Sequence, residues 1–141
     1  MEPVAKELRV EHRGEVIARS TRGRRVLETA GAPVYYFPPE DVRTDLLEPS
    51  RRTSFCEWKG RARYWSLVQG GDRVPDVAWS YPEPSSGYES IAGWLAFYAG
   101  KVDGAWVGDV RAAPQPGGFY GGWVTPDLAG PIKGEPGSAG W

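Results

Sequence analysis

Short runs of alternating apolar and polar residues, separated by Gly or Pro, set the main limit on what this chain can fold into. The run 8–12 alternates in this way, and Arg13-Gly14 separates it from a second run over 15–18. Alternation with a period of two around a turn is typical of a β-hairpin. No helical stretch is long enough for the crossover that joins parallel strands, which needs a dozen or more residues. The sequence therefore predicts a mainly β fold with antiparallel sheets.

The same pattern predicts the remaining strands. They are expected at 24–28, 34–37, 53–58, 61–68, 77–81, 94–98 and within 101–109. Lys59-Gly60 is expected to form the turn between 53–58 and 61–68, because glycine adopts a positive φ without steric cost.

Two short helical segments are expected between these strands. Pro39, Glu40 and Asp41 begin the first, a short helix or 3-10 segment over 39–46, because proline suits a first helical turn and acidic residues favour the positive end of the helix dipole. Ser86 and Glu89 have capping-box spacing, which predicts the second.

The chain has 141 residues, a length typical of one domain. Within it we expect a body over 1–113 and a C-terminal extension over 114–141, rich in Gly and Pro. The extension also carries aromatic residues such as Trp123. It is therefore predicted to be an irregular arm that packs on the same domain.

Charge and composition argue against several classes of protein. The 17 basic and 18 acidic residues give a net charge of −1, whereas nucleic-acid binders carry a basic excess. One cysteine and one histidine cannot form a disulfide or the usual four-ligand zinc site. No apolar stretch has the length of an export signal or a membrane span. We expect a cytoplasmic protein with no metal, cofactor, nucleic acid or membrane partner.

Several blocks of sequence resemble one bacterial family, the domain of unknown function 427. They are 35–43, 45–50, Cys56 with 58–60, 62–66, 78–82, 91–93 and 96–98. The resemblance covers about residues 8–106, and Glu57 stands where the family usually has proline. It implies a β-tent-like fold of two antiparallel sheets joined along one side. Other β-tent proteins often hold zinc on cysteine pairs, which this chain lacks. The family also carries a nucleotidyltransferase-like label.

The candidate ligand site combines charged groups with aromatic rings from separate segments. Its predicted members are Glu40, Asp41, Arg43, Lys59, Tyr64, Trp79 and Tyr81. Arg and Lys donate charge-assisted hydrogen bonds to anions, and rings offer a stacking surface. The competing interpretation assigns the rings to the core and pairs Arg43 with a nearby carboxylate.

Three functions stay open. The leading hypothesis is a small-ligand-binding β domain that recognises an anionic or heterocyclic metabolite through these residues. The second is metal-assisted nucleotidyl or phosphoryl transfer, with Asp41 and Asp45 holding Mg²⁺. The third is a protein-interaction module that uses the aromatic extension, and a homodimer also stays open. Cys56 is expected to be a buried apolar residue rather than a nucleophile, since it has no evident base.

Overall fold

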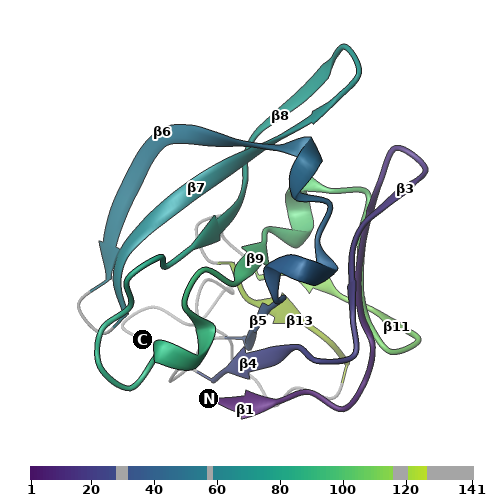
Figure 1. Ribbon diagram of the computed structural model, residues 1–141. Coiled ribbons are helices and arrows are strands. Elements are labelled where there is room, and N and C mark those ends of the chain that lie inside the picture. The colour runs from purple at the N-terminus through teal and green to yellow at the C-terminus, as the bar shows by residue number, and fades with distance from the viewer. Residues whose placement is uncertain (28–31, 57–58, 116–120, 127–141) are drawn as a thin grey trace, which may run out of the picture.

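The computed structural model describes residues 1–27, 32–56, 59–115 and 121–126, and these form short strands joined by turns (Figure 1). The strands are β1 Glu2–Pro3, β2 Leu8–His12, β3 Glu15–Ser20, β4 Arg24–Val26, β5 Val34–Tyr36, β6 Leu47–Cys56, β7 Gly60–Gln69, β8 Asp72–Ser80, β9 Leu95–Phe97, β10 Gly104–Val107, β11 Val110–Arg111, β12 Ala113–Pro114 and β13 Trp123–Val124. The helical segments are single 3-10 turns: η1 Pro39–Asp41, η2 Thr44–Leu46, η3 Glu89–Ile91 and η4 Ala99–Lys101.

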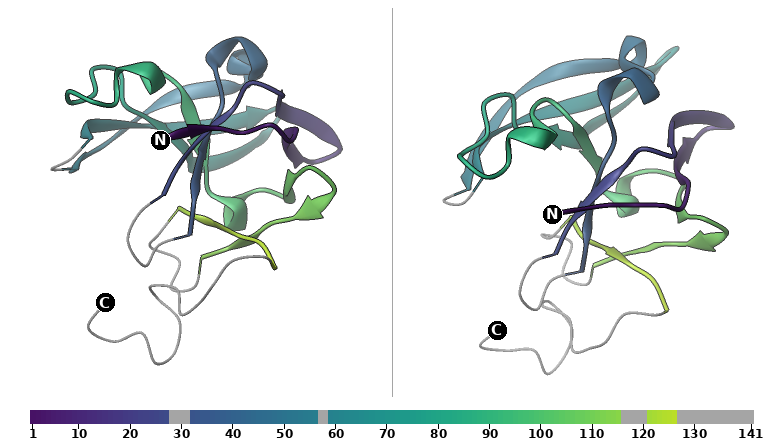
Figure 2. Two further views of the ribbon diagram at one scale, coloured as in Figure 1. Left: turned by 90° about the horizontal axis from the view of Figure 1, so that it is seen from below. Right: turned by 60° about the horizontal axis from the view of Figure 1, so that its bottom comes forward.

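Every strand pairing in the described part of the chain is antiparallel. One four-stranded sheet has the order β6-β7-β8-β9, and another has the order β11-β10-β2-β3. Smaller sheets are formed by β1-β4-β5 and by β12-β13. The long strands β6, β7 and β8 arch over one side of the molecule, and β1 lies on the opposite side (Figures 1 and 2).

Strands β5 and β9 form the seam between two apolar cores. Phe37 and Leu95 exchange backbone hydrogen bonds of 2.8 and 2.9 Å at this seam. Successive side chains of a strand point to opposite faces. Tyr35 and Phe37 accordingly enter the first core, whereas Val34 and Tyr36 enter the second. The alternation seen in the sequence thus lets one short strand fill both cores.

The predicted hairpins are confirmed. Strand β2 pairs with β3, β6 with β7 and β7 with β8. Gly60 has a φ of 105°, as its turn position requires. The short strand expected at 94–98 is present as β9.

The two expected helices are not confirmed as α-helices: the described residues contain only 3-10 turns, the alternative expected for 39–46. Between 39 and 46 the chain makes two separate 3-10 turns, η1 and η2. Val42 interrupts them because it forms a β-bridge with Ala18, and the Arg43 N–H donates to the Ile17 carbonyl at 2.8 Å. Near Ser86 the 3-10 turn η3 begins only after Tyr88, and no side chain caps it. Contacts with other strands override the local helical signal.

Strand β6 begins at Leu47, earlier than the sequence pattern suggests. Pro49 lies within it and is tolerated because β6 is an edge strand whose register is irregular between Pro49 and Thr53. In the described residues, no helix has the length and apolar character needed to cross a bilayer.

Part of the C-terminal extension packs on the body. Trp123 is fully buried, and its indole N–H donates to the Phe97 carbonyl at 2.8 Å. Strand β12 spans the expected boundary at 113/114, and it pairs with β13 inside the extension. The division into two segments stays a prediction. The aromatic residues Phe119, Tyr120 and Trp141, and also Glu57, lie outside the described residues.

Candidate functional site

The predicted site residues divide between two places. Glu40, Asp41 and Arg43 line a shallow hollow of about 240 Å³ beside strand β3. Arg43 donates to both carboxylate oxygens of Asp45, at 2.9 Å each. These hydrogen bonds lower the pKa of Asp45. The Arg43 guanidinium is thus engaged by a carboxylate of its own segment.

Asp41 fastens η1 to strand β3. Its carboxylate accepts a hydrogen bond of 2.7 Å from the Ser20 hydroxyl and one of 3.1 Å from Arg22. Partial desolvation raises the pKa of Asp41, but these hydrogen bonds and the charge of Arg22 outweigh it, so the pKa lies below its usual value. Glu40 lies 3.5 Å from the same guanidinium.

The carboxylates suggested for Mg²⁺ serve separate partners. Asp41 is bound by Ser20 and Arg22, and Asp45 is bound by Arg43. Across the described residues, no three His, Cys, Asp or Glu side chains converge as a metal site requires.

The three predicted aromatic rings lie in the second core. Tyr64, Trp79 and Tyr81 are only 6, 7 and 7% exposed. The backbone of Gly121 lies against Trp79, because a Cβ at that glycine would be 2.0 Å from the indole ring. Lys59 is also buried, at 6% exposure. The structure therefore brings Tyr64 and Trp79 together, as two opposed residues of β7 and β8, while Arg43 lies beside β3.

A different set of charged residues surrounds Tyr64. We call Arg52, Tyr64, Asp76, Tyr98 and Lys101 the tyrosine cluster. The Arg52 guanidinium lies 4.2 Å from the centre of the Tyr64 ring, and the Lys101 amine lies 4.7 Å from that of Tyr98. These are cation–π distances. The Lys101 amine also donates to the Asp76 carbonyl at 3.0 Å, and Arg52 lies 4.0 Å from the Asp76 carboxylate.

The two tyrosines of the cluster interact with each other. The Tyr64 hydroxyl lies 2.9 Å from the Ser54 hydroxyl. Tyr98 is half-buried, and its ring packs 4.6 Å from that of Trp79. Desolvation, followed by the neighbouring Tyr64, raises the pKa of Tyr98 to about 12. Tyr98 consequently stays protonated at physiological pH and can donate a hydrogen bond.

Asp76 occupies a strained position. Its φ is 51°, and it lies where the pairing of β7 with β8 shifts register. Its N–H donates to the Ser66 hydroxyl at 3.2 Å, away from the regular ladder. One carboxylate oxygen, Oδ1, is buried and accepts no hydrogen bond from the described residues. Backbone strain and unsatisfied polar atoms both occur preferentially at functional sites.

Sequence reasoning missed Arg52, Asp76, Tyr98 and Lys101 as site residues. Pro75 was an available signal, because a proline within a strand pattern marks an edge or a bulge. The bulge turns Asp76 toward Arg52 and Lys101, and neither contact follows from spacing alone.

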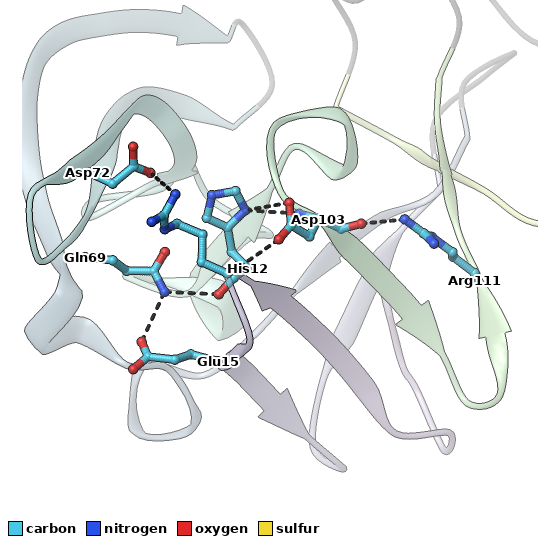
Figure 3. Close-up of polar contacts among 7 residues, drawn as sticks. His12, Glu15, Gln69, Asp72, Asp103 and Arg111 are labelled. Atoms are coloured by element: carbon cyan, nitrogen blue, oxygen red, sulfur yellow. Dashed lines mark hydrogen bonds and ion pairs between the residues drawn. The ribbon is translucent and has the colours of Figure 1, made fainter.

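The single histidine belongs to a third polar group, drawn in Figure 3. The Asp103 N–H donates to His12 Nδ1 at 3.1 Å, and the Asp103 carboxylate lies 3.4 Å from that nitrogen. Gln69 donates to the His12 carbonyl and to the Glu15 carboxylate, at 3.0 Å each. These contacts join the β2–β3 and β7–β8 hairpins to the segment before β10.

Cys56 is half-buried against the second core.

Fold and site together define a β protein of antiparallel sheets with a cation-flanked pair of tyrosines. Residues 1–108 match the family described as NTP_transf_9, Domain of unknown function (DUF427). The chain belongs to this family, which confirms the resemblance inferred from the sequence blocks. Comparison with curated proteins finds no match.

Proposed function

We propose that this protein is a small-ligand-binding β domain that recognises an anionic, heterocyclic metabolite at the tyrosine cluster. The observation that carries the proposal is the placement of Arg52 and Lys101, each over a tyrosine ring. Both cations come from separate elements, β6 and η4, and converge on Asp76.

The charge balance of the cluster supports an anionic ligand. Arg52 lies beside the Asp76 carboxylate and Lys101 donates to the Asp76 backbone carbonyl, so two cations accompany one carboxylate and the cluster carries one excess positive charge. Both cationic side chains are exposed, so a ligand can reach them. Arginine and lysine donate strong charge-assisted hydrogen bonds to phosphate and carboxylate oxygens.

The aromatic and polar groups support a heterocyclic ligand. Tyr98 is half-buried and keeps its phenolic proton in a hydrogen bond with Tyr64, so it offers a ring edge to a ligand. The family label refers to nucleotides, and AMP combines a phosphate with an amino heterocycle. AMP is therefore the first probe.

Binding is preferred over group transfer as the proposed activity. Transfer to or from a nucleotide usually uses carboxylates that hold Mg²⁺. The tyrosine cluster has one carboxylate, and Asp41 and Asp45 are each bound by an arginine.

The proposal is tested by calorimetric titration of AMP into the protein. We expect saturable binding that Arg52→Met or Lys101→Met weakens about tenfold each, the value of one charge-assisted hydrogen bond. Arg51→Met is the matched control, because Arg51 is the exposed arginine that directly precedes Arg52 on the same strand. Adenosine, which lacks the phosphate, should bind at least tenfold more weakly than AMP. Equal affinity of the Arg52 and Arg51 variants would refute the assignment.

We also propose a β-tent arrangement and a bacterial, cytoplasmic setting for this domain. The resemblance in sequence supports both, and the seam of β5 and β9 supports the first, because it joins two sheets along one side. An experimental structure whose principal sheets meet along some other line would contradict the β-tent arrangement.

A further inference from the structure

A second hollow lies away from the tyrosine cluster, near β1 and β11 at the end of the molecule opposite the β7–β8 hairpin (Figure 1). Its volume is about 400 Å³, within the range of small-molecule sites. It is lined by Pro3, Val4, Ala5, Lys6, Arg25, Tyr35, Val107, Val110, Thr125 and Pro126. We call it the N-terminal hollow.

The segment before β2 is held in place as one wall of this hollow. Strand β1 pairs with β4, and the Val4 N–H donates to the Gly23 carbonyl at 2.9 Å. Further along, the Glu7 carbonyl accepts a hydrogen bond of 2.7 Å from Gly108. The wall is thus fastened at both ends, so the hollow is a formed feature of the fold.

The floor of the hollow is aromatic and rigid. Tyr35 is buried and packs 5.2 Å from Trp123, which the Phe97 carbonyl anchors. Valine and proline side chains make up most of the walls. An apolar body of a ligand would therefore be accepted here.

The charged groups that line the hollow are both cationic. They are Lys6 and Arg25. Arg25 hydrogen-bonds to Tyr35 and, through Nε at 2.5 Å, to the Glu2 carboxylate. A guanidinium has five N–H donors, so these two partners leave donors for a further acceptor. Glu2 itself shows that a carboxylate docks on this guanidinium.

We infer that the N-terminal hollow binds a small carboxylate with an apolar body, its carboxylate placed between Lys6 and Arg25 and its hydrocarbon part against Val110 and Tyr35. Arginine matches the two oxygens of a carboxylate, and the apolar walls exclude a fully polar anion such as phosphate. This inference does not depend on the function proposed for the tyrosine cluster.

The test titrates benzoate into the full chain and follows binding by calorimetry. We expect saturable binding, with benzamide and inorganic phosphate at least tenfold weaker. Val110→Trp should fill the hollow and weaken benzoate binding at least tenfold. Val16→Trp is the matched control, because Val16 is 37% exposed and Val110 38%, and both lie on strands of the same sheet outside the tyrosine cluster.

Lys6→Met provides a second variant that does not alter packing, since Lys6 is exposed, and it should weaken benzoate binding several-fold. Arg52→Met should leave benzoate affinity unchanged, which separates this site from the tyrosine cluster. The inference is overturned if benzoate does not bind, if benzamide or phosphate binds as tightly, or if Val110→Trp and Val16→Trp behave alike.

Discussion

Two of the surfaces that carry arginine beside carboxylates use it differently. At the first, which we call the η1–η2 surface, Arg22 and Arg43 face the carboxylates of Glu40, Asp41 and Asp45. Three acids outnumber two cations there. In the tyrosine cluster, Arg52 lies beside the Asp76 carboxylate, Lys101 donates to the Asp76 backbone carbonyl, and both cations lie over aromatic rings.

This difference distinguishes cationic side chains that stabilise the fold from those that can bind a ligand. Both surfaces contain exposed arginine, so the residue type alone does not mark a site. At the η1–η2 surface Arg22 and Arg43 each have a carboxylate already, since Arg22 binds Asp41 of η1 and Arg43 binds Asp45 of its own segment. In the tyrosine cluster Arg52 and Lys101 lie over uncharged rings, so their positive charge is largely uncompensated. The predictions below test this contrast.

The largest effect is expected for ligand affinity. The double variant Arg52→Met/Lys101→Met should weaken AMP binding about a hundredfold or more, since two charge-assisted hydrogen bonds are lost. The matched double variant Arg22→Met/Arg43→Met should change affinity less than about twofold, because those guanidinium groups are already paired. Calorimetric titration of both variants measures the contrast, and equal losses would remove the distinction between the surfaces.

The next effect concerns proton binding by Tyr98. Its pKa of about 12 lies above the ordinary tyrosine value of about 10. A raised pKa in the folded state contributes stability that is complete below the unfolded value and is lost as the pH rises toward 12. Ultraviolet titration of tyrosinate should show a late step that Tyr98→Phe removes.

Tyr88→Phe is the control for this titration, because Tyr88 is half-buried and lies outside the tyrosine cluster. It should leave the late step in place. A late step that survives in the Tyr98→Phe variant would mean that another tyrosine is responsible.

The strand pattern was readable from the sequence because its causes are local. A period of two and a glycine turn are sufficient to specify β2–β3 or β6–β7, and both hairpins formed as predicted. The segment expected over 39–46 is divided into two 3-10 turns for a non-local reason, the bridge from Val42 to Ala18. The pattern of residues in 39–46 does not show that Val42 pairs with Ala18, because Ala18 lies in a strand more than twenty residues earlier.

The candidate site was predictable only in part. Tyr64 and Trp79 were expected on adjacent strands, and they are directly opposed in the pairing of β7 with β8. Lys101 reaches Asp76 only because a bulge rotates one residue and η4 returns to β8. Such contacts depend on tertiary packing, which a single sequence does not reveal.

A smaller effect is expected for stability at the η1–η2 surface. Asp41→Ala should lower the free energy of unfolding by about 2 kcal/mol, because Ser20 and Arg22 lose a shared acceptor. Asp45→Ala should cost much less, since its ion pair with Arg43 is exposed. Urea denaturation measures both.

The stability that Asp41 contributes should decrease as the pH falls. The pKa of Asp41 is lowered in the folded protein, so its contribution is present above the unfolded value and disappears as the pH falls through the folded value. The wild type and Asp41→Ala should therefore converge in stability in acid. A gap between them that persists in strong acid would show that the carboxylate charge is not the cause.

The smallest effect is expected at Asp76, and it has the opposite sign. Asp76→Gly should raise the free energy of unfolding by about 1 kcal/mol, because glycine adopts a φ of 51° without strain and the buried Oδ1 is removed. Asp76→Ala keeps a Cβ at the strained position and is the matched control, which should be about 1 kcal/mol less stable than the glycine variant. Removing a carboxylate that stabilises the fold, such as that of Asp41, lowers the free energy of unfolding rather than raising it. If Asp76→Gly is less stable than the wild type, as Asp41→Ala is expected to be, Asp76 stabilises the fold. Backbone strain at Asp76 would then no longer support a binding site at the tyrosine cluster.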